Sequence, residues 1–339
     1  MKLYTTITAL LLACSAWAAD LYYDGLYFDI INENELSLVH HGDVVEEYDT
    51  DYYTYITVEN NYTNLNPRIV IPEQLNYYGT TYTVTCIGNS AFMGCEHLTH
   101  ITMPKTITTI HNSAFDGCTS LEYINLPEGL TTISERAFSG CKLLRDINIP
   151  TTVNEIAGYA LDSTAWLANQ PDGVVYINDI LYCYKGQLPN SAFIKVKDGT
   201  RVIANQAFLN CKQLYYIYIP GSVEYIGMSA FNGCSSLAKL VLSPGLKHIY
   251  DGAFSDCSML TSVVLPEGLV GIGNWVFTDC NALKSLTIPA SVEYVSPDFM
   301  ERSPSITVHY GGTKSQWSNL TYESPEDVSC TVLCSDGKF

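Results

Sequence analysis

Positively charged residues are scarce in this sequence. Its 339 residues include 17 Lys and Arg against 35 Asp and Glu, which gives a formal net charge of −18. Such an excess of carboxylates repels a phosphate backbone, so the composition argues against a nucleic-acid-binding protein. Charged residues make up only 15% of the chain and hydrophobic residues 47%, which excludes a disordered protein. The 25 tyrosines favour β structure over a helical bundle.

Long apolar runs are also missing. The longest stretch, residues 3–13, is too short to span a bilayer, and it follows the single positive charge of Lys2. Ala16-Trp17-Ala18 then forms a cleavage site of the A-x-A type. The sequence therefore predicts a signal peptide over residues 1–18, a mature chain that starts at Ala19, and no transmembrane segment in that chain.

A second interpretation of the same segment stays open. Leu11-Leu12-Ala13-Cys14 resembles a lipobox, which would leave a lipid-modified Cys14 at the new N-terminus. Both interpretations predict an exported protein, secreted or held on the outer cell surface.

Motifs that carry chemistry are absent as well. The sequence has no C-x-x-C, the usual zinc spacing, and neither G-x-S-x-G nor H-E-x-x-H. We therefore expect no catalytic residues, no metal and no cofactor. One alternative concerns the acidic stretch 20–60, where residues 46–51 could hold Ca²⁺ but lack the ordered spacing of a calcium loop.

What the sequence does contain is a repeat of 23 residues. Each unit reads A-F-x-x-C-x-x-L-x-x-I-x-I-P-x-x-V-x-x-I. The aromatic position of the unit is Phe92, Phe115, Phe138, Phe208, Phe231, Phe254 and Phe277, with Leu161 and Met300 in two degenerate units. The cysteine position is Cys95, Cys118, Cys141, Cys211, Cys234, Cys257 and Cys280.

The spacing within the unit predicts one coil of a solenoid. The alternation I-x-I is typical of a strand with one buried face, and the following Pro ends its hydrogen bonding. So short a unit cannot bury its own apolar face, so neighbouring coils must stack and share a core. The repeat cysteines all sit at the same phase, so we expect parallel, buried, reduced thiols.

The Cys three residues before the strand Leu, the A-F pair and the Pro resemble the BspA-like leucine-rich repeat surface proteins. The resemblance covers residues 20–339. It implies a mainly β leucine-rich-repeat solenoid of 23-residue units with parallel strands. It also implies a secreted or cell-surface binding protein, with adhesion in some members, and no catalytic site.

We expect four segments along this chain: a signal peptide (1–18), an N-terminal β cap (19–86), the solenoid (87–302) and a C-terminal β cap (303–339). The period is broken between Leu161 and Phe208, which indicates an insertion at about 162–190. Asn178-Asp179 between two apolar runs predicts a β-hairpin there that stands out from the solenoid, with Trp166 belonging to it.

Outward positions of the predicted strands show one aromatic cluster. The 23-residue alignment places Phe193 beside Tyr216, and Ala192 beside Tyr215, on adjacent coils. Exposed aromatic side chains often mark protein-binding surfaces, although aromatics also fit strands for packing reasons alone. The predicted binding residues are Phe193, Tyr215, Tyr216, Tyr218, Tyr123 and Lys195.

The sequence thus predicts an exported binding or adhesion protein that recognises an extracellular protein or glycan without catalysis. Two alternatives stay open. One is a carbohydrate-binding accessory protein or glycan-active enzyme that uses the aromatics as a sugar platform. A pair of carboxylates about 5–9.5 Å apart beside them would indicate a glycosidase. The other is a purely structural envelope protein.

Overall fold

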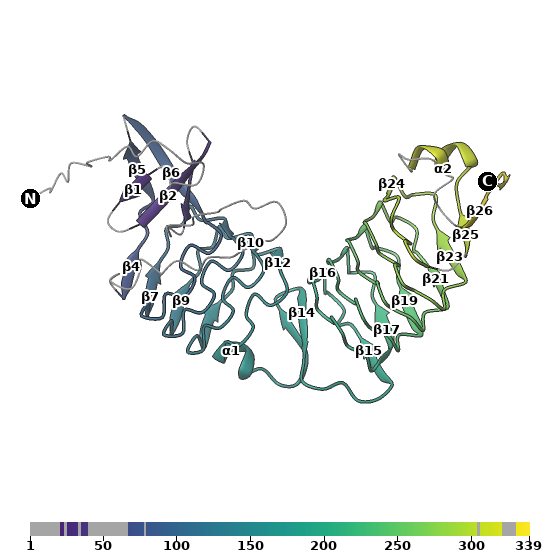
Figure 1. Cartoon of the computed structure of the whole chain (residues 1–339), viewed down its shortest axis with the longest axis horizontal. Coiled ribbons are helices and arrows are strands. Elements are labelled where there is room, and N and C mark those ends of the chain that lie inside the picture. Colours follow the sequence, from purple (N-terminus) through teal and green to yellow (C-terminus); the bar gives the residue numbers. More distant parts are fainter. Residues whose placement is uncertain are drawn as a thin grey trace, which may run out of the picture. The chain divides into compact units, whose positions relative to one another are not determined.

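The computed structural model describes residues 21–23, 26–32, 35–39, 67–77, 79–303, 306–320 and 330–339. The predicted signal peptide, Cys14 and the acidic residues 46–51 lie outside the described residues. The chain divides into two compact units, Met1–Asn169 (unit 1) and Gln170–Phe339 (unit 2), each built mainly of strands (Figure 1).

Unit 1 contains two sheets. The strands of the first are β1 (Leu21–Tyr23), β2 (Leu26–Asn32), β3 (Glu35–Val39), β6 (Thr80–Ile87), β8 (Thr109–Ile110), β10 (Thr132–Ile133) and β12 (Glu155–Ile156), in that order, with β5 (Gln74–Tyr77) also on β6. The second sheet consists of β4 (Arg68–Val70), β7 (His100–Thr102), β9 (Tyr123–Asn125) and β11 (Asp146–Asn148), all parallel. A short helix, α1 (Ala165–Ala168), follows.

Unit 2 repeats the arrangement. One sheet holds β13 (Gly173–Ile177), β14 (Ile180–Lys185), β16 (Val202–Ile203), β18 (Tyr225–Ile226), β20 (His248–Ile249), β22 (Gly271–Ile272) and β24 (Tyr294–Val295). The remaining strands form two sheets. One consists of β15 (Ala192–Lys195), β17 (Leu214–Ile219) and β19 (Lys239–Leu242), and the other of β21 (Ser262–Val264), β23 (Ser285–Ile288), β25 (Thr307–Tyr310), β26 (Thr331–Cys334) and β27 (Gly337–Lys338). Helix α2 (Lys314–Leu320) buries Trp317 and Leu320.

The predicted fold class is confirmed: parallel strands pair at the repeat spacing. Tyr123 lies opposite Asp146, and Ile217 lies opposite Leu240, each 23 residues further along. The structure adds a second parallel sheet that the sequence analysis did not foresee. Its strands are two residues long, and the second residue of each is buried, as at Ile226 and Ile249. We call this ladder from β16 to β24 the short-strand sheet of unit 2.

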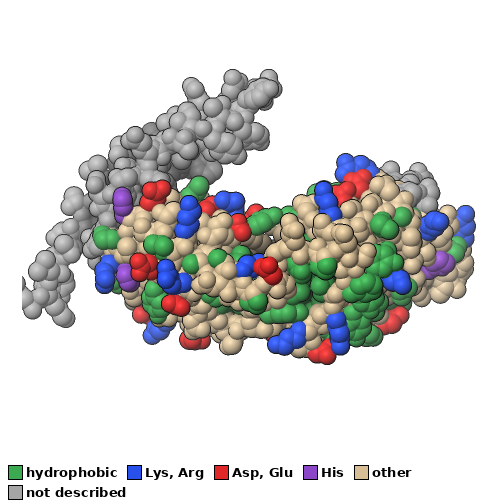
Figure 2. Space-filling model, turned by 90° about the horizontal axis from the view of Figure 1, so that it is seen from below, with side chains coloured by type: hydrophobic (Ala, Val, Ile, Leu, Met, Phe, Trp, Pro, Cys, Tyr) green, Lys and Arg blue, Asp and Glu red, His purple; other side chains and the backbone are tan. Residues whose placement is uncertain are grey.

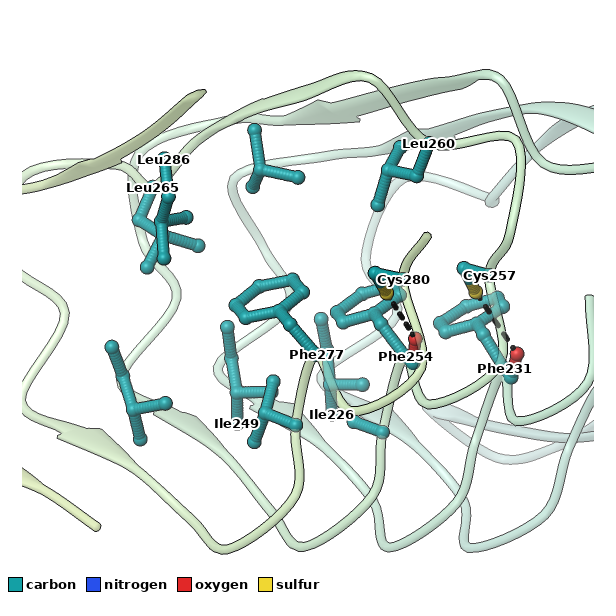
Figure 3. Packing of buried hydrophobic residues seen from close by; sticks show 14 of the residues in the cluster. Ile226, Phe231, Ile249, Phe254, Cys257, Leu260, Leu265, Phe277, Cys280 and Leu286 are labelled. Atoms are coloured by element: carbon teal, nitrogen blue, oxygen red, sulfur yellow. Dashed lines mark hydrogen bonds between the residues drawn. The ribbon is translucent and has the colours of Figure 1, made fainter. Parts of the chain in front are cut away.

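Phenylalanine side chains stack along the axis of each unit and fill its core. In unit 2 the rings of Phe208, Phe231 and Phe254 lie 5.1 Å apart from centroid to centroid, with interplanar angles of 11° and 3°. Figure 3 shows the stacked rings of Phe231, Phe254 and Phe277. Phe277 continues the column at 5.8 Å from Phe254, and all four side chains are fully buried. Each coil therefore completes the apolar environment of its neighbours.

The repeat cysteines form a second buried column. The Cys257 thiol donates to the carbonyl oxygen of Phe231 at 3.4 Å, and Cys280 donates to that of Phe254 at 3.2 Å (Figure 3). Burial raises the pKa of the Cys280 thiol to about 12, so it stays protonated at neutral pH. Cys211 departs from the expectation of burial, because its side chain is partly exposed. It belongs to the first regular coil after the insertion.

Three sequence-based placements in this region were wrong. The hairpin β13–β14 does not stand out, because β14 pairs in parallel with β16 and so becomes part of the short-strand ladder. Trp166 lies on α1, whose N-terminus is capped by the Thr164 hydroxyl, and not in the hairpin. A register shift pairs Ala192 with Leu214, so Ala192 points into the core and not outward beside Tyr215.

Candidate binding surface on unit 2

The aromatic cluster forms where β15 and β17 run side by side. We define it as Phe193, Tyr215, Tyr216 and Tyr218. The Phe193 side chain is 67% exposed. Its ring centroid lies 5.8 Å from that of Tyr215 and 5.6 Å from that of Tyr216. The 23-residue register holds from Phe193 onward and places Phe193 directly opposite Tyr216, so one aromatic ring contacts two on the next coil.

Lys195 and Tyr218 continue the cluster toward the ends of the two strands. The Lys195 ammonium lies 5.6 Å from the centroid of the Tyr218 ring, within range of a cation–π interaction. The Tyr218 hydroxyl accepts a hydrogen bond of 3.2 Å from the Ser243 hydroxyl. Lys195 also approaches Asp198 at 3.9 Å, but both side chains are largely exposed and this ion pair is weak. The Lys195 charge therefore stays accessible to solvent.

The outward positions extend the surface beyond the aromatic rings. Lys239 pairs with Tyr216 and Val241 pairs with Tyr218 on β19. Val264, on β21, is 67% exposed. We call the outward side of β15, β17, β19, β21 and β23 the unit 2 sheet face. Hydrophobic side chains gather on this side of unit 2, with charged side chains of both signs at the margins (Figure 2).

Predicted site residue Tyr123 lies elsewhere. It belongs to β9 in unit 1, where it is 50% exposed between His100 and Asp146 of the neighbouring strands. The other five predicted residues lie together on β15 and β17. Tyr123 is thus a single exposed aromatic on a mixed polar sheet.

The structure reveals a further aromatic group that the sequence analysis missed. Tyr225 and His248 face each other on β18 and β20 of the short-strand sheet, with ring centroids 5.7 Å apart and an interplanar angle of 3°. Tyr250 stacks on both rings. The sequence signal for this group was the residue that precedes the last Ile of each 23-residue repeat, because these residues recur every 23 positions. The two-residue strands gave no alternation by which to recognise an outward position.

Among the described residues, no three His, Cys, Asp or Glu side chains are grouped as a metal site requires. In the same part of the chain, neither helix has the length and apolar character needed to cross a bilayer.

Stacked parallel coils with a ladder of buried Phe and an exposed sheet face define a leucine-rich repeat protein. The family model for the BspA type leucine-rich repeat region matches residues 73–180 and 175–307. The chain therefore belongs to the BspA-type leucine-rich repeat family. None of the curated proteins compared matches it.

Several solved structures resemble the chain, among them the following three. A leucine-rich cell surface protein from Faecalibacterium prausnitzii is 23% identical, with a TM-score of 0.46, over 89% of this chain and 98% of that one. A leucine-rich repeat protein from Bacteroides ovatus is 24% identical, with a TM-score of 0.37, over 86% and 71%. The pneumococcal vaccine antigen PcpA is 16% identical, with a TM-score of 0.37, over 88% and 95%.

Proposed function

We propose that this protein is a secreted or cell-surface adhesion protein that binds an extracellular protein through the unit 2 sheet face. The observation that supports it most directly is the aromatic cluster itself. Phe193 is two-thirds exposed, yet it is held by contacts with Tyr215 and Tyr216, so its conformation is already ordered before a partner arrives. Ordered aromatic side chains contribute large contact areas at a low entropic cost.

The proposal assigns no catalytic role to this face. Glycoside hydrolysis requires two carboxyl groups beside the sugar. The strands β15, β17, β19, β21 and β23 contain no Asp or Glu. A binding surface needs only shape, apolar area and charge, and the unit 2 sheet face offers all three.

Export is the second part of the proposal, and its support is the N-terminal sequence. Processing after Ala18 would release a chain that begins at Ala19. N-terminal sequencing of the protein recovered from the native host tests this directly. A blocked N-terminus with an acylated Cys14 in the membrane fraction would instead show a lipid-anchored protein.

The binding proposal is tested on an array of purified extracellular-matrix and serum proteins, printed beside a glycan array. Tyr216→Ala should weaken binding to any protein that the parent captures by about tenfold or more, as expected for a hot-spot residue. Tyr294→Ala, at an exposed tyrosine of the short-strand sheet, is the matched control and should bind like the parent. Equal binding by the parent and both variants would contradict the proposal. Capture by glycans alone would favour the carbohydrate alternative.

A further inference from the structure

Charge is distributed unevenly over this acidic protein. The chain as a whole has about two acidic residues for every basic one. The strands of the unit 2 sheet face reverse this balance, since their charged residues are Lys195 and Lys239. Lys284 lies immediately before β23, and the side chains of all three lysines are exposed. At the ends of these strands the exposed acids are Asp198, which pairs with Lys195, and Glu267.

The corresponding sheet of unit 1 has no such bias. Its exposed outward residues include Asp146 on β11, and Glu122 and Arg145 stand just before β9 and β11. Both signs are therefore present there. The cationic character is a property of the unit 2 sheet face and not of the repeat, because the same repeat positions carry acids in unit 1.

Apolar side chains lie between the lysines. Val241, opposite Tyr218 on β19, is 39% exposed, and Val264, 23 residues further along on β21, is 67% exposed. A valine can neither donate a hydrogen bond nor stack on a sugar ring. Covering it is favourable only if the partner supplies apolar groups of its own. A hydrated anionic polysaccharide would satisfy the lysines and leave these valines uncovered, whereas a protein partner can satisfy both.

We infer that the partner of the unit 2 sheet face is an acidic protein segment in which apolar side chains alternate with carboxylates. The inference rests on the proposed function and specifies its partner. The aromatic cluster and the valines contact the apolar residues of the segment, and Lys195, Lys239 and Lys284 face its carboxylates. Charge complementarity of this kind speeds association and discriminates against basic partners.

The test uses the full chain and four probes in a binding assay at low and high salt. Three probes are synthetic peptides of equal length, in which Glu alternates with Tyr, Glu with Ser, or Lys with Tyr. The fourth probe is heparin. We expect the Glu/Tyr peptide to bind most tightly, and its affinity to fall about tenfold or more between low and high salt. The Lys/Tyr peptide should not bind.

Charge reversal supplies the matched control. Lys239→Glu and Lys247→Glu change the net charge equally, but Lys247 is an exposed residue just before the short strand β20. Lys239→Glu should weaken binding of the Glu/Tyr peptide about tenfold, because it places a like charge opposite a carboxylate. Lys247→Glu should weaken it by no more than about twofold.

Three outcomes would overturn the inference. An equal loss in both variants would mean that only the net charge matters. Tighter binding of heparin than of the Glu/Tyr peptide would indicate a polysaccharide partner. If Tyr216→Ala weakens capture of a protein from the array while Lys239→Glu does not, the face binds a partner that is not acidic, and the proposed function stands without this inference.

Discussion

Replacing Phe231 by Ala removes one of the two inner rings of the four-ring phenylalanine column in unit 2. The side chain is fully buried, and it stacks at 5.1 Å on Phe208 on one side and on Phe254 on the other. A buried Phe→Ala change costs about 3–5 kcal/mol, from lost burial and the cavity that remains. We expect the loss for Phe231→Ala near the upper end of this range, because Phe231 stacks on two neighbours and each aromatic pair adds about 0.5–1.5 kcal/mol.

Urea unfolding followed by circular dichroism measures this loss, and Phe193→Ala is the matched control. The same atoms are removed there from a side chain that is 67% exposed, so the free energy of unfolding should fall by no more than about 1 kcal/mol. If Phe231→Ala does not fold, Phe231→Leu keeps most of the volume and should show a smaller loss in the same direction. Equal losses at Phe231 and Phe193 would refute the stacked-core explanation.

Further predictions concern the thiols and one close backbone approach. Alkylation of the native protein, followed by mass spectrometry, should label Cys211 before the other repeat cysteines, because it alone among the seven is partly exposed. Burial raises the pKa of the Cys280 thiol to about 12 in the folded protein, against about 8.5 in the unfolded chain. The contribution of this thiol to the free energy of unfolding is therefore complete below about pH 8.5 and is lost as the pH rises toward 12, because only the unfolded chain releases the proton in that range. Cys280→Ala should therefore flatten the alkaline fall in stability by up to about 1.4 kcal/mol per pH unit. Gly245→Ala should destabilise unit 2 far more than Gly199→Ala in urea unfolding. Both glycines have positive φ, but a Cβ at Gly245 would lie 2.0 Å from the Gly221 carbonyl oxygen, while one at Gly199 meets nothing within 4 Å.

The solenoid could be predicted from the sequence because residues at the same position of successive repeats contact one another in the structure. A residue such as Phe231 recurs every 23 positions, and the structure stacks those copies on one another. Periodicity alone therefore predicted which side chains meet, without any knowledge of the loops between them.

The packing of the insertion against the repeats could not be predicted in this way, because the insertion occurs once. Nothing in the sequence of β14 shows that it pairs with β16, since that contact joins a single hairpin to a repeated strand. The register shift at Ala192 has the same origin, because β15 follows the insertion and its first residue turns inward. The aromatic cluster was nevertheless found, since the shift affects Ala192 and leaves Phe193 opposite Tyr216.

Because the contacts between coils join equivalent positions, each unit can be lengthened or shortened by whole coils. Strand pairing joins residues 23 apart, as at Tyr225 and His248, and the thiol of Cys257 reaches the Phe231 carbonyl, which lies 26 residues back. Duplicating or deleting one complete coil by recombination would return every remaining core side chain to a neighbour of the same kind. A deletion one residue longer or shorter would turn core isoleucines to solvent. Such a gene can extend or shorten the unit 2 sheet face in steps of one coil without redesigning its core.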